Sequence, residues 1–161
     1  MIKVIGIDPG LSGTGIGLVH GDGIHVAGYS FGSISTRAQD SIGHRLDQIY
    51  SRSLEFLTQE KPDMVVLEDI FSLKEYPGSG ILLGKVTGVL TLAAFRAGAS
   101  IREIPVREAK KVISGSGSAD KYQVERSVRS LLGHGDAIRP FHASDALALA
   151  LTGFYRYSRA L

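Results

Sequence analysis

Four side chains that can bind a metal ion or transfer a proton stand where a fold gathers such groups. Asp8 ends the first apolar run, and Glu68 directly follows a continuous apolar run in mid-chain. Asp145 lies early in a C-terminal segment with helical spacing, and His142 stands three residues before it on the same helix face. In open α/β sheets, ligands bind at the carboxyl ends of strands. We therefore expect these four groups to converge at one end of a sheet.

Carboxylates and an imidazole in one place suit the cleavage of a phosphodiester only if they hold cations. The phosphodiester is itself negative, so bare carboxylates would repel it. Two divalent ions about 3.5–4 Å apart activate a water molecule and stabilise the leaving oxygen in an in-line displacement. Hard oxygen ligands favour Mg²⁺ or Mn²⁺. The pattern therefore indicates a metal-dependent hydrolytic site.

Each of the four residues also has an ordinary structural explanation. Asp8 precedes Pro9, and aspartate before proline commonly forms a turn or a cap. Glu68 has the type and position of a solvated surface group at the end of a strand. Asp145 places a negative charge near a helix N-terminus, which the helix dipole favours, and His142 has the position of a capping or surface histidine. Taken singly, these residues leave both interpretations open.

The chain must alternate strands and helices to bring the four residues together. We expect strands at residues 3–8, 14–20, 24–31, 64–67 and 100–104, helices at 40–60, 81–97, 105–113, 119–132 and 142–155, and a loop at 70–79. Gly21, Asp22 and Gly23 form a hairpin signal, so the first three strands should be an antiparallel meander. The fourth run is continuously apolar, as in a central parallel strand. The sequence predicts an α/β fold with a mixed five-stranded sheet flanked by helices.

Length and composition limit the class of protein. The 161 residues suit one domain over residues 1–161, and 43% hydrophobic with 21% charged residues excludes a disordered chain. The absence of cysteine excludes disulfides and thiolate metal sites. The N-terminal apolar run is too short for a signal peptide, and the run at 81–95, interrupted by Lys85, is too short to span a bilayer. We expect a soluble, cytoplasmic protein with no membrane partner.

Five blocks of sequence follow one another along the chain. They are GIDPG at residues 6–10, Glu68 with Phe71 three residues later, LGKVTGV at 83–89, GSGSADK at 115–121 and SDALA at 144–148. Together they closely resemble the RuvC family of Holliday-junction resolvases, which has the RNase H-like fold. The resemblance implies an endodeoxyribonuclease of recombination and repair. It would cut four-way DNA junctions symmetrically and leave 5′-phosphate and 3′-hydroxyl ends.

The resemblance also implies a role for each of the four residues. Asp8, Glu68 and Asp145 would be catalytic metal ligands, with two Mg²⁺ or Mn²⁺ ions per subunit. His142 stands where the best-described members carry a fourth aspartate, although histidine is also seen there in the wider family. A neutral imidazole can bind a divalent ion, whereas an imidazolium cannot. We hypothesise that His142 is a ligand, or that it assists water activation or product release.

Three further residues match DNA-binding positions of the family. Phe71 matches an aromatic side chain that inserts into the unstacked junction centre, although it could instead pack on its own core, and Tyr76 could share either role. Lys110 and Lys121 match positions that hold the DNA backbone. The stretch at residues 102–129 has seven basic and four acidic residues, a modest positive excess on a chain of net charge +2. Arg126 and Arg129 could equally belong to a solvated helix face.

The apolar helix at 81–97 has apolar residues on more than one face. One face should cover the sheet. The resemblance implies that the other contributes to a two-fold homodimer, whose paired sites mirror the symmetry of a four-way junction. Burial within the monomer is the alternative. A branch-migration complex is a further partner that the family implies.

Three other functions fit parts of the pattern. An ATP-binding protein of the actin and sugar-kinase type shares the core and the glycine-rich opening, but needs two such domains. A junction-binding protein without cleavage would have lost a ligand at His142. An RNA-processing nuclease of the same fold differs from the resolvases in its substrate.

Overall fold

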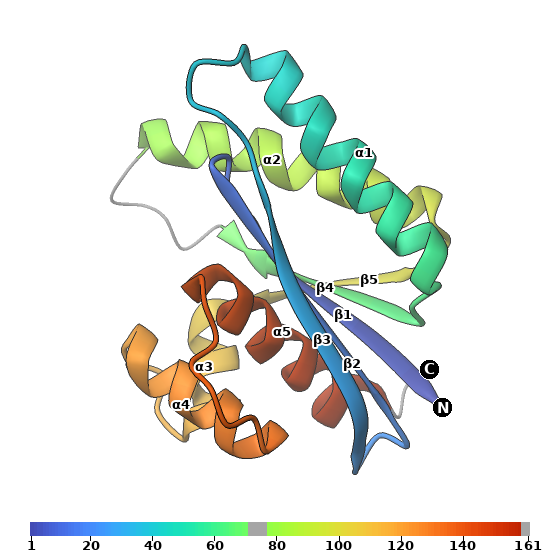
Figure 1. Cartoon of the computed structure of the whole chain (residues 1–161), viewed down its shortest axis with the longest axis vertical. Coiled ribbons are helices and arrows are strands. Elements are labelled where there is room, and N and C mark those ends of the chain that lie inside the picture. Colours follow the sequence, from blue (N-terminus) through green and yellow to red (C-terminus); the bar gives the residue numbers. More distant parts are fainter. Residues whose placement is uncertain (71–76, 159–161) are drawn as a thin grey trace.

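The structure is a computed structural model in which residues 1–70 and 77–158 are described. The strands are β1 (Ile2–Asp8), β2 (Gly13–Gly21), β3 (Val26–Ser35), β4 (Met64–Asp69) and β5 (Ser100–Pro105). The helices are α1 (Ile42–Glu60), α2 (Pro77–Arg96), α3 (Val106–Ser114), α4 (Lys121–Leu132) and α5 (Phe141–Tyr157). Their order along the chain is the predicted one (Figure 1).

The strands form one mixed five-stranded sheet in the order β3-β2-β1-β4-β5. The first three strands form the predicted antiparallel meander, and β4 runs parallel to both β1 and β5. Ile7 of β1 pairs with Leu67 of β4. This register places the next residues, Asp8 and Glu68, side by side where the two strands end.

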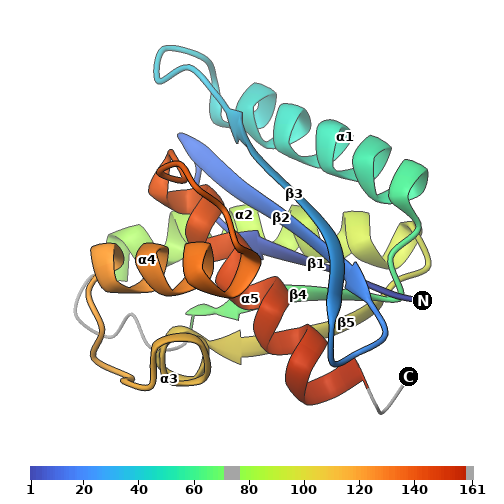
Figure 2. The same cartoon turned by 60° about the horizontal axis from the view of Figure 1, so that its bottom comes forward.

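Helices cover both faces of the sheet and create two separate cores (Figure 2). Helices α1 and α2 pack on one face, where Ile5 and Ile7 of β1 are fully buried. Helices α3, α4 and α5 pack on the other, where Val4 of β1 is fully buried. Alternate residues of β1 thus point to opposite cores, and Asp8 lies on the same face as Val4, beneath α5.

Helix α5 lies almost directly on the backbone of β1 and β2. A Cβ atom at Gly6 would overlap the carbonyl oxygen of Ala146, and one at Gly15 would overlap that of His142. At Gly17 it would lie 2.6 Å from the backbone nitrogen of Leu147. These three glycines, which we call the glycine floor, set how closely α5 approaches the sheet.

Several predicted boundaries differ from the structure, and the largest differences are at β3 and α2. Strand β3 begins at Val26, not at residue 24, because the Asp22 side chain accepts the backbone N–H groups of Ile24 and His25 and holds them in a turn. It also continues to Ser35, which pairs with Gly13. Helix α2 begins at residue 77, so the predicted loop at 70–79 loses its last residues. Proline is well tolerated in the first turn of a helix, so Pro77 does not prevent this start.

Helix α2 is longer than predicted, and the expectation that this stretch is too short for a membrane is wrong. By length and composition, residues 78–96 form the one helix in the described part of the chain that could cross a bilayer. In this fold one face of the helix is core. Val86, Leu90 and Ala93 are fully buried beside α1 and the sheet.

The glycine floor leads to a stability prediction. Gly17→Ala should lower the free energy of unfolding by at least about 2 kcal/mol, because the added methyl group presses on the backbone of α5, which cannot move aside without shifting a helix. Gly32→Ala is the matched control, since a Cβ there has no atom within 4 Å. Urea unfolding measures both. Equal, small effects of the two substitutions would show that α5 does not depend on close contact with the floor.

Candidate active site

Three carboxylates from distant parts of the chain line one cavity at the end of the sheet. Asp8 comes from β1, Glu68 from β4 and Asp145 from the second turn of α5, and they border a cavity of about 150 Å³. Apolar side chains complete its wall: Val106, Ala109, Val124, Ala148 and Leu149. The predicted convergence of the three carboxylates is confirmed by the structure.

Two lysines reach the same cavity from the helices below the sheet. Lys110 of α3 and Lys121 of α4 both line it, and the Lys121 ammonium also lies 4.9 Å from the centre of the Phe141 ring. Arg129 instead pairs with Glu125, four residues earlier, at 2.7 Å, and because Glu125 is buried this pair is not the solvated helix face that was the alternative. From the basic stretch at 102–129, Lys110 and Lys121 are therefore the cations placed to meet a phosphate at this cavity.

His142 lies against Asp8 and not in the wall of the cavity. Its Nδ1 is 2.7 Å from Oδ2 of Asp8, and half of its side chain is exposed, against a tenth for Asp8. The ring lies over the turn between β1 and β2: a Cβ built on Gly13 would be 3.5 Å from its Cδ2 atom. The structure thus places His142 beside one carboxylate, Asp8, and over the turn that follows it.

The carboxylates repel one another and resist ionisation. Burial, followed by the charge of Asp8 and a hydrogen bond to it, raises the pKa of Glu68 to about 8. Burial and the charge of Asp8 likewise raise the pKa of Asp145 to about 6, although His142 and Lys110 oppose the rise. The hydrogen bond to Asp8 raises the pKa of His142 above its ordinary value. In the metal-free protein, protons therefore supply part of the positive charge that the site requires.

This cluster of carboxylates fits a divalent metal site. Asp8, Glu68 and Asp145 bring hard oxygen donors to one cavity, and such donors are the ligands that Mg²⁺ and Mn²⁺ prefer. Within residues 1–70 and 77–158, no three acidic or histidine side chains already surround one point as a finished metal-binding group. Asp8 instead hydrogen-bonds to Glu68 and to His142.

The two aromatic residues predicted to sense the junction centre, Phe71 and Tyr76, lie outside the described residues. The described residue before them, Ile70, lies near α2: its Cδ1 atom would be 3.8 Å from a Cβ built on Gly84.

Sequence patterns did not identify Glu125, a buried carboxylate that contacts the segment leading into α5. Glu125 is only 2% exposed, and it accepts the backbone N–H of Ile138 at 2.9 Å in addition to its ion pair with Arg129. Arg139 lies 3.7 Å away. These contacts tie α4 to the segment that leads into α5. The i,i+4 spacing of Glu125 and Arg129 was visible in the sequence, but the burial of the pair was not.

The raised pKa of Glu68 leads to a prediction about stability. A carboxyl whose pKa is higher in the folded than in the unfolded protein stabilises the fold below the unfolded value, and this contribution is lost as pH rises through the folded value. Glu68→Gln should therefore raise the melting temperature of the metal-free protein at about pH 8 and change it little at about pH 5. Thermal unfolding in EDTA measures this, with Glu103→Gln, an exposed strand carboxylate, as the control. The same shift at both pH values would contradict a raised pKa of Glu68 in the folded protein.

Comparisons with known proteins show the family of the chain. The RuvC family model, described as crossover junction endodeoxyribonuclease RuvC, matches residues 4–153. The chain is 36% identical to the protein of that name from Syntrophomonas wolfei, over 97% of this chain and 90% of the relative. It is 38% identical to the one from Photorhabdus laumondii, over 94% of this chain and 86% of the relative.

Solved structures show the same relationship. The RuvC structure from Thermus thermophilus superposes with a TM-score of 0.84 at 32% identity, covering 99% of this chain and 96% of that one. The same protein in complex with a Holliday junction substrate gives a TM-score of 0.88 at 31% identity, covering 99% of this chain and 97% of that one. The yeast mitochondrial resolvase Ydc2, at 9% identity and a TM-score of 0.62, shares the fold.

The family match and the relatives span almost the whole chain, and the fold is the RNase H-like fold that the sequence predicted. The chain therefore belongs to the RuvC family of crossover junction endodeoxyribonucleases.

Proposed function

We propose that this protein cleaves four-way DNA junctions, by metal-dependent phosphodiester hydrolysis at the cavity between β1, β4 and α5. The observation that carries the proposal is that three carboxylates and two lysines line one cavity. The relation to a protein solved with a Holliday junction substrate supports the same substrate class here. Symmetric cuts that leave 5′-phosphate and 3′-hydroxyl ends are part of the proposal.

Asp8, Glu68 and Asp145 would hold the metal, which we take to be two Mg²⁺ ions per subunit, with Mn²⁺ as the alternative. Bound divalent cations supply an activated water and a counter-charge for the leaving oxygen. Lys110 and Lys121 would bind phosphates of the DNA backbone, since they approach the cavity from α3 and α4. The apolar wall limits the water that screens these charges.

His142 would act through its contact with Asp8. In the metal-free protein it shares a hydrogen bond with Asp8, and its raised pKa favours the protonated ring. A protonated imidazole cannot be a ligand, so His142 must lose that proton before it can bind metal. The same proton is available for transfer within the site. Both roles require the contact with Asp8 and predict that His142→Ala slows cleavage.

A homodimer through α2 would bring two such sites onto one junction. The outer face of the helix is apolar and exposed: Ile81 is 65% exposed, Leu92 45% and Phe95 73%. These residues repeat at helical spacing along one side of α2, opposite the buried face. Covering this surface with a second copy removes it from water, and two-fold symmetry matches that of the junction.

Phe71 would insert at the junction centre, and base stacking is worth about 1–3 kcal/mol.

A branch-migration complex as partner and a cytoplasmic location belong to the same proposal. They follow from the RuvC relationship and from the substrate class it implies.

The test is cleavage of an end-labelled, mobile four-way DNA junction in Mg²⁺. We expect paired nicks in opposite strands, none with Asp8→Asn, and a rate lower by roughly 100-fold or more with His142→Ala. Linear duplex DNA and a four-way RNA junction are the substrate controls. Tight junction binding without cleavage in either Mg²⁺ or Mn²⁺ would instead indicate a binding protein, and preferred cleavage of the RNA would indicate an RNA-processing enzyme.

The dimer is tested in the same assay. Phe95→Glu places charge in the proposed interface, far from the cavity, so light scattering should detect a monomer. Its nicks should lose their pairing between opposite strands. A dimeric Phe95→Glu protein with normal paired nicks would place the interface elsewhere.

A further inference from the structure

The turn that follows Asp8 is held from two sides. It spans residues 9–12, between β1 and β2. On the α5 side, the His142 ring lies over this turn. A Cβ atom at Gly10 would be 3.7 Å from Cε1 of His142, and one at Gly13 would be 3.5 Å from Cδ2 of His142. The turn therefore forms a surface against which the imidazole rests while Nδ1 faces Asp8.

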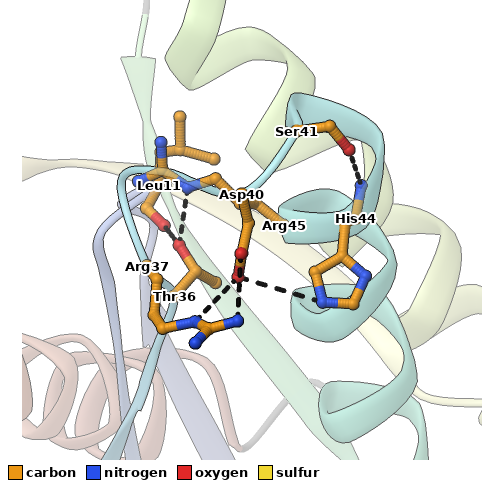
Figure 3. Close-up of polar contacts among 7 residues, drawn as sticks. All are labelled: Leu11, Thr36, Arg37, Asp40, Ser41, His44 and Arg45. Atoms are coloured by element: carbon orange, nitrogen blue, oxygen red, sulfur yellow. Dashed lines mark hydrogen bonds and ion pairs between the residues drawn. The ribbon is translucent and has the colours of Figure 1, made fainter.

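On the α1 side, Thr36 binds the turn through its backbone and its side chain. Its backbone N–H donates to the carbonyl oxygen of Ser12 at 3.2 Å, and its hydroxyl donates to that of Leu11 at 2.5 Å. Figure 3 shows this hydroxyl between the Leu11 carbonyl and α1. Two consecutive carbonyl groups of the turn are thus satisfied from one residue just beyond β3.

Arg45 of α1 donates to both Thr36 and the turn, and Figure 3 shows the contact with Thr36. Its Nε donates to the Thr36 hydroxyl at 2.8 Å, and its Nη2 donates to the Ser12 hydroxyl at 3.0 Å. The planar guanidinium group suits two acceptors at a fixed separation, which a lysine ammonium does not match. Arg45 lies one helical turn before the fully buried Ile49, so the backbone that carries the Arg45 side chain is held near the core.

Neighbouring charged residues serve a different purpose. Arg37 and His44 both face Asp40, at 3.1 Å and 3.9 Å. The partners of Arg45 are neutral hydroxyl groups. Arg45 therefore binds Thr36 and the turn. Arg37 instead pairs with Asp40 at the surface, so its substitution is a matched control for that of Arg45.

We propose that Arg45 is a positioning residue, which acts through Thr36 and Ser12 to hold the turn after Asp8 and thereby sets the His142 ring against Asp8. The inference rests on the proposed junction cleavage for its effect on rate. Its effect on His142 is independent of that function, and it can be measured without DNA or metal. Failure of one proposal is therefore distinguishable from failure of the other.

The experiment compares Arg45→Met with Arg37→Met in two measurements. The first is the NMR spectrum of the His142 ring nitrogens in the metal-free protein, assigned with His142→Ala. Arg45→Met should shift or broaden these signals, because the ring loses its support, whereas Arg37→Met should leave them unchanged. The second is single-turnover cleavage, which Arg45→Met should slow by roughly ten- to one-hundred-fold while the junction Kd, measured in EDTA, stays within about two-fold.

Thr36→Val disrupts the same contacts in a second way, because it removes the hydroxyl between Arg45 and Leu11 and keeps the side-chain shape. It should reproduce both effects of Arg45→Met, and Thr36→Ser should restore both. Unmoved His142 signals in Arg45→Met and Thr36→Val would overturn the proposal. So would a loss of cleavage that follows a loss of junction binding, because Arg45 would then be a contact to a DNA phosphate.

Discussion

The close approach of α5 to the backbone of β1 and β2 is the constraint on which the active site depends. Asp8 and Asp145 are far apart in sequence, and they meet only because the helix lies against the glycine floor of Gly6, Gly15 and Gly17. A helix held away by side chains would carry His142 and Asp145 away from the strand ends. Residues without side chains thus determine where the charged ones act.

That arrangement concentrates negative charge, at a cost in stability. Burial, and then the charge of Asp8, raises the pKa of Glu68 and of Asp145, so the metal-free fold holds these carboxylates where ionisation is disfavoured. Two apolar cores, the parallel pairing of β1 with β4 and the buried contacts of Glu125 maintain the geometry. Clustered carboxylates at a cation site lower the stability of the metal-free fold, and functional sites commonly have such a cost in stability.

Much of this could be predicted from the sequence, because strand ends and helix spacing follow from local patterns. The order of elements and the convergence of Asp8, Glu68 and Asp145 are confirmed. The position of His142 beside Asp8 but outside the cavity wall could not be foreseen, because i,i+3 spacing gives the helix face and not the side-chain direction. The interactions of Arg45 were invisible as well, since they join residues distant in sequence.

The boundaries that were wrong have local causes of a different kind. Residues near Asp22 have apolar and β-favouring types, but a side-chain acceptor captured their backbone N–H groups. Helix α2 begins before its apolar run because its first four residues are proline, glycine, serine and glycine, which carry no apolar helical pattern. Hydrophobic periodicity detects the apolar part of an element and misses the rest.

The most direct test of the account is Mn²⁺ binding to the DNA-free protein, measured by electron paramagnetic resonance for wild type, Asp8→Asn, Asp145→Asn and the double variant. If the two carboxylates share one site, each single substitution should weaken binding by roughly ten-fold or more, and the double variant should be far less affected than the product of the two effects predicts. Independent, multiplying effects, or Mn²⁺ affinity unchanged by both substitutions, would contradict a common metal site formed by β1 and α5.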